Sequence, residues 1–345
     1  MRRRLRALVP WGVAALVLVY VFSHTSGQAL ADALGRVSLW RFALVLLGLT
    51  LGALLADAWV IWLALRATAQ HVEQPRDSAG DSAARPALAY RDVFLVRGAS
   101  ALLSLLSYGA GQGGVMYFLY RRHGISVAAG ASAVLLATAA SMAVLALLSG
   151  LGILAGAIPD RPEIRAVAWV ALAAVPVYVG IVAARPRFLL RRQLFRALFA
   201  VRPGALVRVL GARVLHLGVL ITGHWLVMHL FGIAVPPATA LLRLPAMFMV
   251  AALPISPAGL GTTQAAAITL FSSHAGAPDQ AAREATVLAY SLSCHVAGVV
   301  VLVLVGLVCW RWLPRAGVVT PDRSRAGARG AAPDGDSDRP NPCSE

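Results

Sequence analysis

The sequence predicts an all-α polytopic membrane protein with six spans and two glycine-broken helical hairpins, arranged as an inverted repeat. Three observations predict this fold: the composition, the arginine-rich loops between apolar stretches, and a small-residue turn that occurs twice. Apolar residues make up 59% of the chain and charged residues 13%, and the mean hydropathy is +0.72. Several apolar stretches reach the length of about 20 residues that a bilayer crossing requires. We therefore expect the 345 residues to form one membrane unit.

The predicted spans alternate in direction from a cytoplasmic N-terminus, because the basic flanks of spans stay in the cytoplasm. An arginine-rich start precedes the first apolar stretch, for which a cleavable signal peptide is the alternative interpretation. Seven arginines and no acidic residue between 185 and 208 mark the clearest cytoplasmic loop. The six spans are expected at residues 8–22, 42–65, 127–148, 167–184, 209–230 and 287–310.

These spans are expected to form one transmembrane domain over residues 1–312, with halves 1–150 and 167–312. The polar segment 66–92 is rich in Pro, Ser, Asp and Arg and predicts a flexible cytoplasmic loop. Residues 313–345 are rich in Pro, Gly, Asp and Arg and predict a disordered tail. Both termini are therefore expected in the cytoplasm.

Two further apolar segments, residues 93–120 and 238–275, are interrupted by the same type of turn. The first turn reads Ala110-Gly111-Gln112-Gly113 and the second reads Ala258-Gly259-Leu260-Gly261. Arginines flank both ends of the first segment, which predicts a hairpin, either re-entrant or fully crossing. An unwound backbone in a membrane must be shielded by protein or face a cavity, and paired broken helices in two halves indicate a transported-substrate site. Each half reads span, span, hairpin, span from opposite sides, which predicts the inverted repeat.

Each hairpin carries an arginine in its first limb, Arg97 and Arg243. An arginine at the centre of a span costs about 2.5–3.5 kcal/mol on insertion scales, so it needs a partner or a cavity. The two guanidinium groups could bind a phosphate in a bidentate manner. Alternatively, both side chains could snorkel to an interface. Asp57 in the second span is expected to pair with Arg97 or another arginine, with proton coupling as the alternative.

The two turns supply the remaining candidate substrate-binding residues. Glycines allow backbone N–H groups to approach an anion at the start of a half-helix, or they allow tight helix packing. The glutamine amides could donate to phosphate or cap exposed backbone. These candidates are Gly111, Gln112, Gly113, Gly259, Gly261 and Gln264.

Several functional classes lack support in the sequence. The histidines and cysteines show no metal-ligand or disulfide spacing, and no nucleophile motif or paired carboxylates occur. We therefore expect no metal, no cofactor and no enzymatic activity. The net charge of +16 lies in loops without an aromatic-interleaved basic stripe, so nucleic acid is not an expected partner. The chain contains no lysine, and its arginines present planar forks that suit phosphate and carboxylate.

Residues 108–114 (YGAGQGG) with 120–126 (YRRHGIS), and residues 253–264 (LPISPAGLGTTQ), resemble the lysylphosphatidylglycerol synthase transmembrane-region family. The resemblance covers about residues 8–312 and implies a flippase-like domain that binds or translocates lipids with polar, often anionic, headgroups. Family members that aminoacylate lipids carry a separate transferase domain, for which we expect no room here. The family often has acidic residues beside both turns, whereas Gln112 and Gln264 stand here. These glutamines make cation- or proton-linked use doubtful and reduce repulsion of an anionic headgroup.

The resulting expectation is a lipid transporter of a bacterial inner membrane that holds a phosphate-bearing headgroup between the two hairpins. An anionic phospholipid and a prenyl-phosphate-linked lipid both fit this description. The alternative is a non-transporting scaffold or accessory partner of a lipid- or glycan-synthesising enzyme in the membrane. A homo-oligomer and a membrane-enzyme partner are both compatible with the sequence, whereas a lipid-modifying enzyme would require a base and nucleophile that the sequence lacks.

Overall fold

The computed structural model describes residues 27–68, 88–105, 107–159, 201–252 and 259–313, with isolated residues between 162 and 199. In these residues the regular structure is helical apart from one isolated bridge between Ile233 and Ala275. Four of the helices are long and apolar enough to cross a membrane. The prediction of an all-α membrane protein is therefore confirmed.

The four membrane-crossing helices are α3 (Leu39–Thr68), α6 (Val127–Leu154), α10 (Pro203–Leu230) and α13 (Gln280–Trp312). Each contains one of the predicted spans; α6 begins after the N-cap Ser126, and α10 begins at a proline. The Asp279 carboxylate accepts a hydrogen bond from the Ala282 N–H at 2.7 Å and begins α13 seven residues before the predicted start. Predicted parts that lie largely outside the described residues are the spans 8–22 and 167–184, the loops 66–92 and 185–208, and the tail 313–345.

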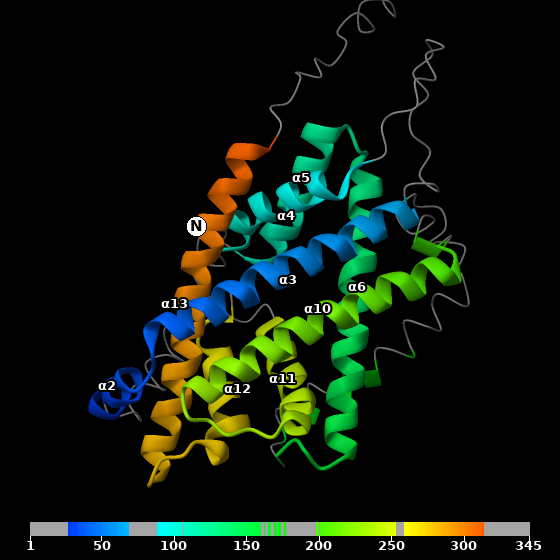
Figure 1. Cartoon of the computed structure of the whole chain (residues 1–345). Coiled ribbons are helices and arrows are strands. Elements are labelled where there is room, and N and C mark those ends of the chain that lie inside the picture. Colours follow the sequence, from blue (N-terminus) through cyan, green and yellow to red (C-terminus); the bar gives the residue numbers. More distant parts are fainter. Residues whose placement is uncertain are drawn as a thin grey trace, which may run out of the picture.

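Two helical hairpins lie between these spans, as the sequence predicts (Figure 1). The first consists of α4 (Tyr90–Ser104) and α5 (Tyr108–His123), and the second of α11 (Pro237–Ala252) and α12 (Thr262–Phe271). At 1.5 Å per residue the longest of these limbs measures about 24 Å, less than the hydrocarbon core of about 30 Å. Each described limb is therefore shorter than a perpendicular crossing of the hydrocarbon core, which favours the re-entrant form of the hairpins.

The first hairpin does not break at the glycine turn, so the predicted position is wrong by about one helical turn. The break lies between α4 and α5, where the Ser107 hydroxyl accepts a hydrogen bond from the Ala110 N–H at 3.1 Å. A serine N-cap begins a helix by satisfying a free backbone donor, so Gly111 and Gly113 are already helical. A Cβ at Gly111 would stand 2.8 Å from Ser104, which shows that this glycine allows α5 to pack closely on α4.

The second hairpin breaks where the sequence predicts. Gly259 and Gly261 lie between α11 and α12 with φ of +73° and +86°, which residues with a Cβ rarely adopt. Ala258, the first residue of that predicted turn, lies outside the described residues. The same four-residue pattern thus serves helix packing in one hairpin and chain reversal in the other.

Helices α3 and α10 lie side by side and cross the middle of the molecule (Figure 1). Small residues bring them together in a reciprocal way. A Cβ at Gly52 of α3 would stand 3.2 Å from Val219, and a Cβ at Gly223 of α10 would overlap Leu49. Close backbone approach at glycines is a main source of helix association in membranes.

The buried apolar side chains form two large clusters, one around each hairpin. In α3 the cluster around the second hairpin includes residues up to Leu49, and the cluster around the first hairpin begins at Val60. In α10 the cluster around the first hairpin ends at Ala212, and the cluster around the second hairpin begins at Ile221. The segments of α3 and α10 between these limits belong to neither of the two clusters, and the polar groups described next lie there.

Candidate functional site

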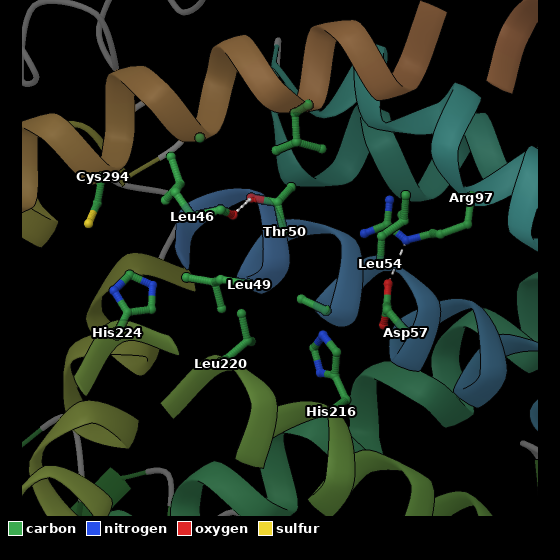
Figure 2. A pocket seen from close by; sticks show the side chains of 13 residues that line it. Leu46, Leu49, Thr50, Leu54, Asp57, Arg97, His216, Leu220, His224 and Cys294 are labelled. Carbon is green, nitrogen blue, oxygen red and sulfur yellow. Dashed lines mark hydrogen bonds and ion pairs between the residues drawn. The ribbon is translucent and has the colours of Figure 1, made fainter. Parts of the chain in front are cut away.

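A cluster of charged side chains occupies the boundary between the two apolar clusters. Asp57 of α3 accepts a hydrogen bond at Oδ2 from Nε of Arg97, on α4, at 2.5 Å. Its other oxygen accepts from a terminal nitrogen of Arg213, on α10, at 2.8 Å. Figure 2 shows Arg97 and Asp57 facing each other across the space between α3 and α4. One carboxylate therefore joins the consecutive helices α3 and α4 to α10, whose Arg213 lies 156 residues from Asp57.

The depth of this cluster matters for function. Asp57 and Arg213 lie in the middle third of α3 and α10, which are both long enough to cross the hydrocarbon core. Their side chains are 13% and 5% exposed, and that of Arg97 is 17% exposed. Arg97 therefore pairs with Asp57 inside the protein instead of snorkelling to an interface, and Asp57 pairs with Arg213 as well.

Arg213 has the most extensive set of partners in the cluster. Besides Asp57, its terminal nitrogens donate to the Ala137 carbonyl on α6 at 3.1 Å and contact Nδ1 of His216 at 3.1 Å. Its buried Nε has no hydrogen-bond partner among the described residues. The described residues therefore leave one donor of this guanidinium group enclosed and unsatisfied.

These side chains line a cavity of about 370 Å³, which we call the charged cavity. Its wall includes Gln112 from the first hairpin and Phe248 and Ala251 from the second, so both hairpins contribute to it. Thr138 and Ser141 add hydroxyl groups from α6. The volume falls within the range of about 300–1,000 Å³ that is typical of small-molecule sites.

The charges of the cavity do not balance. Two arginines and one aspartate give a net charge of +1 with the histidines neutral, and no other acidic residue of the described chain lines the cavity. Burying an unbalanced charge is costly, so the structure favours an anion as the missing partner. Sequence reasoning predicted Arg97, Gln112 and Asp57 for the site, and the structure brings these three to one cavity.

Arg243 lies elsewhere. Its Nε donates to the Ala157 carbonyl after α6, and a terminal nitrogen donates to the Leu270 carbonyl near the end of α12, each at 2.5 Å. Arg243 does not line the charged cavity, although it lies on the same helix as Phe248. The structure therefore does not bring Arg97 and Arg243 to one described cavity.

Gln264 caps backbone, one of its two predicted roles. It is fully buried, and its Oε1 accepts a hydrogen bond from the Gly261 N–H at 2.6 Å. Gly259, Gly261 and Gln264 are absent from the lining of the charged cavity, as are Gly111 and Gly113. Their predicted role in substrate binding stays a prediction.

Sequence reasoning missed Arg213 and His216. A signal was present, because Arg213 is a cation four residues inside the predicted fifth span, the same feature that singled out Arg97. Because Arg213 follows the arginine-rich loop 185–208 closely, it was not distinguished from the arginines of that loop. No group of three or more His, Cys, Asp or Glu side chains gathers at a metal-binding distance in the part of the chain that the structure describes.

The family model described as the lysylphosphatidylglycerol synthase TM region matches residues 7–306 of the sequence. The chain belongs to this family. The match confirms the resemblance. It covers the predicted first span and all the described helices, and it ends at residue 306 within α13. No curated protein and no solved structure matches the chain. Family and helices together indicate a multi-pass membrane protein.

Proposed function

We propose that the protein binds a lipid with an anionic, phosphate-bearing headgroup and moves it across the membrane. The observation that carries this proposal is the charged cavity, which has one excess positive charge at the middle of the membrane-crossing helices. Transport, and not catalysis, is proposed because a binding site at mid-depth can be reached from either leaflet.

The chemistry of the cavity suits a phosphate. Guanidinium groups form strong charge-assisted hydrogen bonds to phosphate oxygens, and both Arg97 and Arg213 line the cavity. Gln112 and Thr138 supply neutral polar groups to the same space. An anionic phospholipid and a prenyl-phosphate-linked lipid share this headgroup chemistry, so both stay candidate substrates.

An inverted repeat would provide the movement, and the packing supports one. α13 packs on α4, the first limb of the first hairpin, and α6 packs on α11, the first limb of the second. The two hairpins lie toward opposite ends of the molecule in Figure 1. The reciprocal contacts at Gly52 and Gly223 hold α3 and α10 together, and these are the two spans that the repeat would pair. Rocking of one half against the other about this centre would expose the cavity to each side in turn.

The proposed orientation places both termini in the cytoplasm of a bacterial cell, in its inner membrane. Arginines gather at the ends of α3, α5 and α13 and at the starts of α4 and α10, which lie in the upper half of Figure 1. Cytoplasmic loops carry an excess of arginine. The residues concerned are Arg66, Arg91, Arg121, Arg122, Arg202, Arg208 and Arg311.

The test is lipid movement in liposomes that contain the purified protein. Labelled phosphatidylglycerol, a labelled prenyl phosphate and labelled phosphatidylcholine are followed between leaflets. Arg213→Gln is the test variant, and Arg208→Gln on the exposed side of the same helix is the control. A hydrogen bond to a charged group contributes about 1.5–3 kcal/mol, so Arg213→Gln should weaken headgroup binding about tenfold to a hundredfold.

Movement of an anionic lipid that Arg213→Gln slows and Arg208→Gln leaves unchanged would support the proposal. Equal rates in wild type and Arg213→Gln would overturn the site. A folded wild-type protein that moves neither anionic lipid would overturn transport and favour the scaffold function.

A further inference from the structure

A second pocket of about 230 Å³ adjoins the charged cavity. The two share Asp57, Arg97, His216, Leu220 and His224, so they meet at the charged cluster. The remaining wall comes from α3 and α13 and is almost entirely apolar. It consists of Leu46, Leu49, Thr50, Ala53, Leu54, Cys294, Gly298 and Leu302.

We infer that this apolar pocket holds a hydrocarbon chain of the lipid whose headgroup occupies the charged cavity. The inference rests on the proposed function and adds to it a subsite for the tail. Its central observation is the continuity of the two spaces at Asp57 and Arg97, because a molecule that fills both must be charged at one end and apolar at the other.

Several polar groups of the apolar pocket are already hydrogen-bonded within the protein. The Thr50 hydroxyl donates to the Leu46 carbonyl at 2.8 Å, and Nδ1 of His224 is hydrogen-bonded to the Tyr290 hydroxyl at 2.8 Å. Both oxygens of Asp57 are bonded to arginines. A water-soluble ligand would find few free partners in this space, whereas a hydrocarbon chain gains dispersion contacts with the leucines. Figure 2 shows Leu49 and Leu220 between the charged pair and His224.

The position of α13 offers the chain a route from the bilayer. Most residues in the most apolar window of this helix are not fully buried, and Val296, Val300 and Leu304 expose more than half of their surface. Gly298, on α13, lines the pocket, and no atom lies within 4 Å of the position that its Cβ would take. A lipid tail could therefore enter beside α13 without crossing water, while its headgroup moves to the charged cavity.

The experiment uses two photoreactive probes on the protein in phosphatidylcholine nanodiscs. The first is hexadecyl phosphate with a diazirine in the middle of the chain, and the second is a short, water-soluble alkyl phosphate with a diazirine next to the phosphate. Crosslinked positions are identified by peptide mass spectrometry. Gly298→Leu and Ala53→Leu fill the apolar pocket from two helices, and Gly48→Leu, at an exposed glycine of α3 outside both pockets, is the matched control.

We expect the long-chain probe to label the wall of the apolar pocket, with loss of this labelling in Gly298→Leu and Ala53→Leu but not in Gly48→Leu. The short probe should label the charged cavity in all four proteins. Labelling of the charged cavity by the short probe, with the long-chain probe confined to lipid-facing residues, would overturn the tail subsite and leave the proposed function standing. Failure of both probes to label the charged cavity in the folded wild type would overturn both proposals.

Discussion

Replacement of Asp57 by asparagine tests the charged cluster most directly. The change keeps the size of the side chain but removes the charge that two buried arginines share. Breaking a buried ion pair by removing one partner costs about 3–5 kcal/mol. We expect a loss of about 3 kcal/mol in the free energy of unfolding, near the lower limit of this range. The reason is that Arg97 is 17% exposed and the asparagine oxygen still accepts one hydrogen bond.

Second-site variants separate charge from geometry. Arg97→Gln leaves the carboxylate with Arg213 and should cost less, about 1.5–2 kcal/mol, at the lower end of the range for the loss of a hydrogen bond to a charged group. Asp57→Asn combined with Arg213→Met restores the net charge of the wild-type cavity, so the double variant should be more stable than the sum of the two single changes predicts.

The assay is unfolding in mixed micelles with increasing dodecyl sulfate, followed by tryptophan fluorescence. Asp32→Asn, at an exposed carboxylate of α2 (Gly27–Gly35), is the control and should change the free energy by less than about 0.5 kcal/mol. A value within about 1 kcal/mol of wild type for Asp57→Asn, as for a surface ion pair, would refute the argument that this carboxylate is the buried counter-ion.

Three further predictions concern the hairpins; the same unfolding assay measures the changes in stability, and the liposome assay measures lipid movement. Gly111→Ala should lower the free energy of unfolding by about 1–3 kcal/mol, because the new Cβ would meet Ser104. Gly113→Ala has open space around its Cβ and should stabilise α5 by up to about 1 kcal/mol. Equal effects of the two changes would contradict the packing role of Gly111. Gly261→Ala should cost about 1–3 kcal/mol because φ is +86°, and a neutral result would show that this turn can relax. Arg243→Ala should cost about 2 kcal/mol through its two carbonyl bonds but slow lipid movement less than Arg213→Gln does; the reverse order would place Arg243 in the substrate path.

The position of the first helix break shows a limit of sequence reading. The glycine pattern at Gly111 and Gly113 predicted an unwound turn, yet the chain breaks four residues before Gly111, where Ser107 caps α5. Glycine permits a turn and also permits close helix contact, so its identity alone does not choose between the two. The choice depends on whether a neighbouring helix lies against it, as α4 does here at Ser104.

The sequence by itself determined the all-helical membrane fold, two hairpins in matching places, and Asp57 and Arg97 as charges that need partners. These features are local, because apolar length, helix-capping residues and the cost of a buried charge can all be read along one segment. Only the tertiary structure decided that Arg213, 156 residues from Asp57, completes the cluster and that Arg243 bonds backbone carbonyls instead. The physical reason is that contact between side chains on different helices depends on the rotation and crossing of those helices. Small residues such as Gly52 and Gly223 set the rotation and the crossing of α3 and α10. They do so through contacts between two helices, which cannot be read from one segment alone.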